Sequence, residues 1–363
     1  MNKESVKKIL GKFPILLYWQ KCISGMKNPE YMKTISGEGG MIFRICERGY
    51  SSDEHSEKNC DKIAYNISIN NSGDGFFALF RASLNYLYFS STLNLEPYII
   101  WGTNVAYYEK NNPIFADNVF LYYFNQVSNN CIDSYKYVID SMWAHQTIAE
   151  NIKGTSNGGY YTNDDYIFKL GRIIKKYISL NKFTQNKISL DLKKIEFNKS
   201  DNSDKGKRWL GIHIRGTDYK QNCIEHPTMP SISEYFEVID ELLKKNQFEE
   251  IFLATDDSEF QADFISRYGE KVHFYSDVLR LSGDESVAFS NNKRENHKYL
   301  LGYEVLRDAI TLSLCDGLIC GLSQVSIAVR MFKAARDAEF DYLHIIDKGI
   351  NYKGKKFERP QND

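Results

Sequence analysis

An arginine and an aspartate follow a short apolar run in the second half of the chain. Residues 209–214 are almost entirely apolar, and Arg215 and Asp218 come shortly after them. Such a run is typical of a buried strand, and in open α/β sheets ligands bind beyond the carboxyl ends of the strands. A guanidinium at that position, next to Gly216, is suited to a two-point contact with a phosphate group. These residues therefore predict that the chain binds a phosphorylated or nucleotide-linked molecule.

A second candidate for anion binding lies where Ser323 and Gln324 join an apolar run to a predicted helix. The N-terminus of a helix has free N–H groups and a partial positive charge, and both attract anions. Ser323 could cap this helix, bind a phosphate group, or do both. The loop formed by Gly73, Asp74 and Gly75 is a shorter signal of the same kind, because it too lies between a predicted strand and an apolar helix.

Carboxylates follow two of the predicted strands. Asp256 and Asp257 come after the apolar run at 251–254, and such a pair could bind a divalent metal. Two carboxylates are too few oxygen ligands on their own, so we expect a cap on the following helix and a polar contact instead. Glu225 lies in the loop after Arg215 and is either a general base or an exposed loop residue.

Two further polar residues have more than one interpretation. His213 lies inside the run at 209–214, and its side chain shares a face with that of Arg215, because alternate residues of a strand point to the same side. It is therefore either a core histidine or a site residue. Asp308 lies in a predicted helix, on a face with both apolar and polar neighbours. The sequence pattern therefore does not decide whether its side chain is exposed to solvent or belongs to a site.

Strands alternate with helices through the second half, which predicts a parallel, Rossmann-like sheet. Ser231 and Glu234 have the spacing of a capping box at the start of the first of these helices. The predicted strands are 209–214, 251–254, 272–275, 317–320 and 342–346. The predicted helices are 232–246, 258–268, 302–315 and 324–338.

The first half contains one predicted strand–helix–strand unit, with strands at 63–69 and 97–101 and a helix at 76–93. Another helix is predicted at 165–181. Residues 197–208 are polar and lack an apolar period, which is typical of a domain boundary. We therefore expect an N-terminal α/β domain over 1–200, a Rossmann-like domain over 205–350 and a polar tail over 351–363.

Composition limits the class of protein. The 363 residues carry a formal net charge of −1, whereas a general nucleic-acid-binding protein has a basic surplus, so we expect no nucleic-acid partner. The 7 cysteines include no C-x-x-C pair, which argues against a structural zinc site and for a reducing compartment. Apolar residues make up 42% of the chain, which is ample for domain cores of ordinary size.

The N-terminus combines lysines with an apolar, aromatic stretch at 13–19. The stretch is too short for a membrane span and lacks a small-residue cleavage site of the kind that follows a signal peptide. It either packs as a helix on the protein or touches an anionic membrane surface.

Taken in order, these motifs resemble the GDP-fucose-dependent fucosyltransferase superfamily. The likeness is closest to its α-1,6-fucosyltransferases of the nodulation-factor and N-glycan core type, and more distant to protein O-fucosyltransferases and α-1,2-fucosyltransferases. The family block H-x-R-R-x-D corresponds to residues 213–218, and its A-T-D-D strand end corresponds to residues 254–257. Its late helix, strand and S-Q-V segment correspond to residues 306–325, so the likeness spans about 205–335.

The resemblance implies two Rossmann-like domains in a variant GT-B architecture. It implies transfer of fucose, or a close analogue, from a GDP-sugar to a glycan hydroxyl, with inversion and without a metal or other cofactor. Arg215 would bind the β-phosphate of the donor, and Ser323 and Gln324 would complete the phosphate site. His213 and Asp308 would line the guanosine pocket. The other implied residues of the cleft are Gly73, Asp74, Gly75, Asp218, Tyr235, Asp256 and Asp257.

The chain departs from the family pattern at two positions. Gly216 replaces the second arginine, and Tyr219 replaces the lysine after the family aspartate, although Lys220 could compensate. The general base would be Glu225 or Asp218. The alternatives are a non-catalytic homologue that binds nucleotides or glycans, or a transferase that uses another nucleotide sugar.

The resemblance implies that a eukaryotic Golgi enzyme of this family would carry an N-terminal membrane anchor. We find none in the sequence, so we expect a bacterial-type enzyme that builds a surface polysaccharide, either free in the cytoplasm or at the inner face of the membrane.

Overall fold

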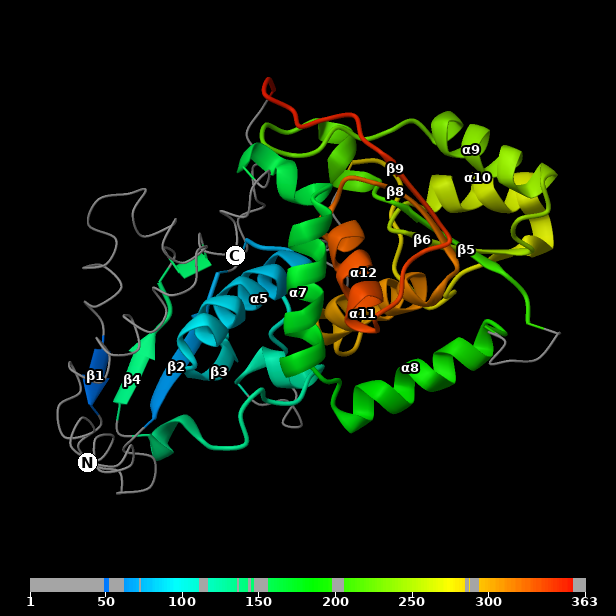
Figure 1. The fold of residues 1–363 in the computed structure, drawn as a ribbon. Coiled ribbons are helices and arrows are strands. Elements are labelled where there is room, and N and C mark those ends of the chain that lie inside the picture. Colours follow the sequence, from blue (N-terminus) through cyan, green and yellow to red (C-terminus); the bar gives the residue numbers. More distant parts are fainter. Residues whose placement is uncertain are drawn as a thin grey trace. The chain divides into compact units, whose positions relative to one another are not determined.

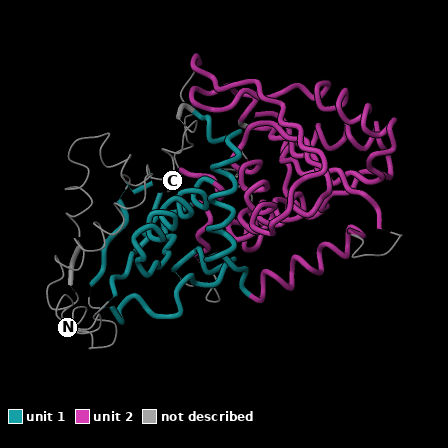
Figure 2. Tube along the Cα trace, viewed as in Figure 1, with its two compact units in different colours: residues 1–72, 78–105, 113–181 teal, residues 73–77, 106–112, 182–363 magenta. Residues whose placement is uncertain are grey.

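The structure is a computed structural model that describes residues 49–51, 62–71, 73–110, 117–135, 137–142, 145–146, 156–197, 206–284, 287 and 294–354. The chain forms two compact units (Figure 2). Unit 1 contains residues 1–72, 78–105 and 113–181, and unit 2 contains residues 73–77, 106–112 and 182–363. The basic and aromatic N-terminal segment and most of the polar tail lie outside the described residues.

Unit 2 is built on a five-stranded sheet in which every neighbouring pair of strands is parallel. Its strands are β5 (Trp209–Ile214), β6 (Glu250–Thr255), β7 (Val272–His273), β8 (Gly317–Gly321) and β9 (Tyr342–Ile346). The order across the sheet is β7-β6-β5-β8-β9. All residues of β5, β6 and β8 are buried, as expected for strands covered on both faces. The predicted Rossmann-like sheet is therefore confirmed.

Helices connect these strands (Figure 1). They are α9 (Ile232–Lys244), α10 (Ser258–Tyr268), α11 (His297–Leu314) and α12 (Gln324–Ala335), with the short 3-10 helices η4 (Thr217–Gln221) and η5 (Gly269–Lys271) in the loops. A further helix, α8 (Lys182–Lys194), comes before β5 in the chain. The capping box predicted at α9 is present, since Glu234 Oε2 accepts a hydrogen bond from Ser231 N at 2.9 Å.

The strand order reverses next to β5. From β5 the chain proceeds to β6 and β7 on one side, and α11 then carries it back to β8 on the other side of β5. In parallel α/β sheets a crevice forms outside the carboxyl ends of the two strands at such a reversal, and ligands bind there. The carboxyl ends of β5 and β8 are therefore where unit 2 positions a site.

One hydrophobic core of unit 2 joins the sheet to α9 and α10. Ile239 and Leu242 of α9 and Phe264 of α10 pack with buried strand residues such as Ile212 and Leu253. These helix residues recur on one face, the pattern that places a helix against a sheet. The core fixes the positions of the strands and therefore of the loops that begin at their carboxyl ends.

Unit 1 contains a four-stranded sheet in the order β1-β4-β2-β3. Its strands are β1 (Gly49–Ser51), β2 (Ile63–Ile69), β3 (Glu96–Trp101) and β4 (Tyr137–Asp140), and only β1 pairs antiparallel. Its helices are α5 (Phe76–Leu93), whose first two residues group with unit 2, and α7 (Asp164–Tyr177), with 3-10 turns η1 (Val119–Tyr122), η2 (Ile132–Ser134) and η3 (Ser156–Tyr161). The predicted strand–helix–strand unit is confirmed, with β2 and β3 parallel.

The predicted α/β class is confirmed for the described chain. α8 was not predicted, and it groups with unit 2, whereas the sequence division placed residues up to 200 in the first domain. Within the described residues, no helix has the length and apolar character needed to cross a bilayer.

Candidate functional site

Arg215 directly follows β5, at the edge of the sheet where the strand order reverses. Its Nη1 lies 2.6 Å from Asp256 Oδ2, and its guanidinium centre lies 5.7 Å from the centroid of the Tyr219 ring. The side chain remains 28% exposed, so a ligand can reach it. The predicted arginine therefore lies at the carboxyl end of the strand, in contact with Asp256 and Tyr219.

Asp256, at the end of β6, organises the loop after β5. Besides its ion pair with Arg215, its carboxylate accepts hydrogen bonds from Gly216 N and Thr217 Oγ1, each at 2.8 Å. Thr217 has a φ of +39°, which an L-residue adopts only at a cost, and these bonds stabilise it there. Asp256 thus positions Arg215.

Asp257 caps α10, because its Oδ1 accepts hydrogen bonds from Glu259 N at 2.8 Å and Phe260 N at 3.2 Å. Its Oδ2 lies 2.6 Å from Lys220 Nζ. The expected cap and polar contact are therefore both observed. In the described part of the chain, no three His, Cys, Asp or Glu side chains come together as a metal-binding group.

The first departure from the family pattern, Gly216, has a structural cause. A Cβ at Gly216 would lie 2.5 Å from Asp257 Cβ, and Asp257 is fully buried, so the packing leaves no room for a larger residue. Lys220 is paired with Asp257 and, at 3.1 Å, with Glu259. The expectation that Lys220 compensates for the missing charges is thus not supported, because its ammonium group is committed to these two carboxylates.

Ser323 is the N-cap of α12 and is 2% exposed. Its Oγ accepts a hydrogen bond from Ser326 N at 2.9 Å, and Ser326 Oγ accepts one from Ser323 N at 3.0 Å. The hydroxyl of Ser323 also lies 3.5 Å from His213 Nδ1. Of the two roles that the sequence left open, capping is observed, and the Ser323 hydroxyl also donates to Ser326 Oγ at 3.2 Å.

His213 lies in β5, where it pairs in register with Cys320 of β8. Burial lowers the pKa of its imidazole to about 4, so the ring is neutral at pH 7, although Asp256 nearby acts in the opposite direction. Tyr235 lies beneath it in α9 and donates a hydrogen bond to the His213 carbonyl at 3.3 Å. Tyr235 is 1% exposed and part of the core, so its observed contact is with the backbone of β5.

Asp308 lies in α11 and is only 9% exposed. Burial raises the pKa of its carboxyl to about 7, while the positive charges of Arg307 and Arg280 partly oppose this shift. No hydrogen bond to the side-chain carboxyl of Asp308 is found among the residues that the structure describes. A nearly buried carboxylate without such a bond is costly unless it is protonated or bound by a ligand.

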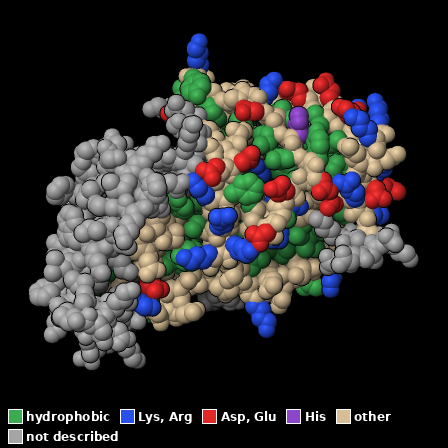
Figure 3. Space-filling model, viewed as in Figure 1, with side chains coloured by type: hydrophobic (Ala, Val, Ile, Leu, Met, Phe, Trp, Pro, Cys, Tyr) green, Lys and Arg blue, Asp and Glu red, His purple; other side chains and the backbone are tan. Residues whose placement is uncertain are grey.

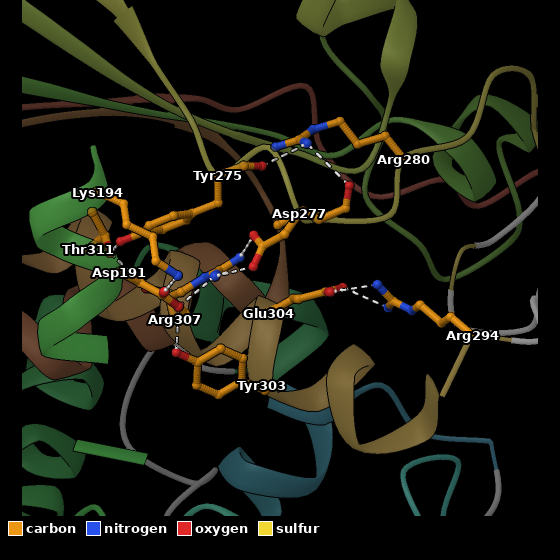
Figure 4. Close-up of polar contacts among 11 residues, drawn as sticks. Asp191, Lys194, Tyr275, Asp277, Arg280, Arg294, Tyr303, Glu304, Arg307 and Thr311 are labelled. Atoms are coloured by element: carbon orange, nitrogen blue, oxygen red, sulfur yellow. Dashed lines mark hydrogen bonds and ion pairs between the residues drawn. The ribbon is translucent and has the colours of Figure 1, made fainter. Parts of the chain in front are cut away.

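Next to Asp308, Arg307 is the centre of a polar cluster that the sequence did not reveal (Figure 4). Its Nη1 lies 2.7 Å from Asp191 Oδ2 of α8, and its Nη2 lies 2.6 Å from Asp277 Oδ1 in the segment after β7. Tyr303 also donates to Asp191, at 2.7 Å. Burial opposes ionisation of Asp191, but hydrogen bonds from Lys194, Arg307 and Tyr303 outweigh it and keep the Asp191 pKa below its ordinary value.

The cluster joins three segments that are distant in sequence, because Asp191 and Asp277 lie 116 and 30 residues from Arg307. Arg307 is fully buried, so its charge must be compensated by these carboxylates. A sequence search limited to local spacing could not have found such partners.

The remaining predicted residues lie in loops and turns. Glu225 is exposed, has a φ of +67° and donates through its backbone N to Asn351 O at 2.8 Å. Asp218 lies in η4, within one turn of Arg215. Gln324 is the first residue of α12. The loop of Gly73, Asp74 and Gly75 groups with unit 2, directly before α5.

Acidic and basic side chains are interspersed over the described part of the face in Figure 3. This agrees with the formal net charge of −1. The positive charge that matters for an anionic ligand is therefore local, at Arg215 and the start of α12.

No protein-family model matches the chain, and no curated protein matches it. Similar solved structures do exist. The α-1,6-fucosyltransferase NodZ, in a crystal soaked with GDP-fucose, is 15% identical with a TM-score of 0.42, over 76% of this chain and 93% of NodZ. A structure of NodZ from Bradyrhizobium is 14% identical with a TM-score of 0.41, over 76% and 93% of the two chains.

POFUT1 in complex with GDP is 10% identical with a TM-score of 0.42, over 80% of this chain and 99% of POFUT1. TM-scores this low add no support to a particular function, which has to come from the residues of the site.

Proposed function

We propose that this protein is a glycosyltransferase of variant GT-B architecture that transfers fucose, or a close analogue, from a GDP-sugar to a hydroxyl of a glycan acceptor, with inversion. One observation carries the proposal. Arg215 and the N-terminus of α12 follow neighbouring parallel strands, β5 and β8, on the two sides of the strand-order reversal. A guanidinium and a helix N-terminus at that edge form a site for a diphosphate.

The donor contacts follow from this placement. Arg215 would bind the β-phosphate, and the N-terminus of α12, with Ser323 and Gln324, would complete the phosphate site. His213 and Asp308 would bind the guanosine part. The carboxylate of Asp308 is matched to guanine, which has two adjacent N–H donor groups at N1 and N2.

The chemical step needs charge stabilisation at the leaving group. The acceptor hydroxyl oxygen forms a bond to the anomeric carbon while the bond from that carbon to the β-phosphate oxygen breaks, and GDP leaves with the electron pair. Arg215 and α12 would stabilise the negative charge that develops on the diphosphate. The hydroxyl proton would pass to a carboxylate, with Asp218 and Glu225 as candidates. No step in this scheme needs a metal or another cofactor.

The proposal is tested by measuring transfer from GDP-fucose to a panel of glycan acceptors, with GDP release as a second readout. Removal of the Arg215 guanidinium in Arg215→Met should lower the transfer rate by about 100-fold or more, as loss of a donor to the leaving charge does. Arg208→Met is the matched control, because Arg208 lies before β5 and pairs with Asp341 at 2.7 Å. Equal rates in wild type and Arg215→Met would contradict the mechanism.

A non-catalytic GDP-binding protein is the second candidate, and the packing around Gly216 and Lys220 favours it, because both leave the site with less positive charge. Tight GDP binding with neither transfer nor donor hydrolysis would support this candidate. Thermal shifts with GDP, UDP and dTDP separate a GDP-sugar donor from other nucleotide sugars. The acceptor class that we propose, a bacterial surface polysaccharide precursor in the cytoplasm, is tested by the acceptor panel.

A further inference from the structure

Arg280 has hydrogen-bonding capacity that the described residues leave unused. Its Nη1 donates to the backbone carbonyls of Tyr275 at 3.0 Å and Val278 at 3.3 Å. Its Nε is buried and makes no hydrogen bond with any residue that the structure describes. A guanidinium has five N–H donors, and a buried one without an acceptor is costly. The arrangement therefore indicates an acceptor beyond the residues that the structure describes, such as a ligand.

The segment that anchors Arg280 is attached to α11 (Figure 4). Tyr275, whose carbonyl accepts from Arg280, packs its ring 3.8 Å from the Arg307 guanidinium and hydrogen-bonds through its hydroxyl to Thr311 Oγ1 at 2.9 Å. Asp308 follows Arg307 directly and lies one helical turn before Thr311, so it is on this part of the helix. The charges of Arg280 and Asp308 also act on each other, as expected for close neighbours.

Two carboxylates on one face of α11 differ in how they are satisfied. Glu304 lies one turn before Asp308, and it accepts two hydrogen bonds from Arg294, at 2.7 and 2.9 Å. The Asp308 carboxyl has no such partner in the described part of the chain, although the positive charge of Arg280 acts on it. Among the residues that the structure describes, the Asp308 carboxyl and the Arg280 Nε thus both lack a hydrogen-bond partner, and the charges of the two groups act on each other.

We infer that Arg280 is a specificity-determining residue that donates to the O6 oxygen of a guanine base whose N1–H and N2–H groups are accepted by Asp308. The inference rests on the proposed function and extends it to a residue outside the motifs. Guanine presents these donors and this acceptor along one edge, and arginine binds guanine O6 well. Adenine has an amino group in place of O6 and no hydrogen on N1. The Arg280 donor would then face a donor and the Asp308 acceptor would face an acceptor, so neither hydrogen bond could form.

The surrounding contacts fix Arg280 before any ligand binds. Asp277, three residues before Arg280, forms a two-bond pair with Arg307 through distances of 2.6 and 3.0 Å. The hydrogen bond between Tyr275 and Thr311 attaches the same segment to α11. Groups held in this way lose little freedom on binding, which favours discrimination between similar bases.

The test is calorimetric titration of the full chain with three nucleotides. They are GDP, 6-thio-GDP, which replaces O6 by a weaker sulfur acceptor, and IDP, which lacks the 2-amino group. Wild type should bind GDP about 10-fold more tightly than either analogue. In Arg280→Met the preference for GDP over 6-thio-GDP should fall to about 1, while the preference over IDP remains.

Asp308→Asn should give the reverse pattern, with the preference over IDP lost and the preference over 6-thio-GDP kept. Arg267→Met is the matched control, because Arg267 pairs with Asp240 on the surface of the same unit, and both preferences should remain. Arg280→Lys keeps the charge and replaces the methionine variant if that variant does not fold. In Arg280→Lys the preference for GDP over 6-thio-GDP should be partly lost.

An unchanged preference for GDP over 6-thio-GDP in Arg280→Met and Arg280→Lys would overturn the inference and leave the proposed function standing. If wild type fails to bind GDP at all, the proposed function fails, and the inference fails with it. The two failures are therefore distinguishable in one set of titrations.

Discussion

At the scale of single residues, the site depends on how closely the ends of β5 and β6 pack together. Asp256 holds Arg215 and the two residues after it, and Asp257 occupies the space next to Gly216. The guanidinium is therefore oriented before a ligand arrives, which lowers the entropic cost of binding. The absence of a second arginine is a consequence of the same packing.

The packing at Gly216 gives a stability prediction. Gly216→Ala should lower the free energy of unfolding by about 1–3 kcal/mol, because the new methyl group would overlap the buried Asp257. Chemical denaturation measures the change. Gly75→Ala is the control for stability, since a Cβ there meets no atom within 4 Å, and a loss in Gly216→Ala no larger than in this control would contradict the packing argument.

At the scale of elements, α11 connects the candidate base site to the rest of unit 2. Arg307 joins it to α8 through Asp191 and to the segment after β7 through Asp277, while Asp308 follows on the next position of the helix. A change at this junction should therefore affect both stability and the position of Asp308.

Asp191→Asn tests this junction. The substitution leaves the buried Arg307 with one carboxylate partner, and we expect a loss of about 3 kcal/mol in the free energy of unfolding. Asp240→Asn is the control, because it removes a surface pair with Arg267 and should cost less than about 1 kcal/mol. Equal losses measured by denaturation would show that the buried cluster adds no more than an ordinary surface pair.

Many elements could be predicted from the sequence because their apolar residues recur at the right period. The bounds of β5 and α5 agree with those predicted, and the alternation of strands and helices correctly places Arg215, Asp256 and Ser323 at one edge of the sheet. The cap and polar contact at the Asp256–Asp257 pair were also foreseen.

Other features depend on contacts between distant residues and could not be predicted locally. α8 buries Thr184, Ile188 and Asp191, so two of its three buried residues are polar and no apolar stripe marks it. α11 begins at His297, five residues before the predicted start, and Glu109 accepts from Lys298 N near its N-terminus at 3.1 Å across 189 residues. The roles of Arg280 and Arg307 were missed for the same reason.

At the scale of the whole molecule, Asp308 links stability to pH. Burial raises its pKa from 3.8 to about 7, so the folded chain favours the protonated form. Below pH 3.8 the carboxyl is protonated in both states and costs nothing. As the pH rises from 3.8 through about 7, Asp308 ionises more readily in the unfolded chain than in the folded chain. The free energy of unfolding therefore falls over this pH range.

Asp308→Asn removes this dependence. Above pH 8 the variant should be more stable than wild type by up to about 4 kcal/mol, since each pKa unit corresponds to about 1.4 kcal/mol, and near pH 4 the two should be equal. Thermal unfolding across this range measures the difference. The same variant should bind GDP more weakly, a trade-off typical of strained sites, and a stability difference that does not vary with pH would refute the assignment.

The central claim is that Arg215 and the start of α12 together bind the diphosphate of a GDP-sugar. Titration of wild type and Arg215→Met with GDP and GMP tests it most directly, because the two nucleotides differ only in the β-phosphate. Wild type should prefer GDP by about 10-fold or more, and the preference should disappear in Arg215→Met but remain in Arg208→Met. A preference that survives the loss of the Arg215 guanidinium would contradict the claim.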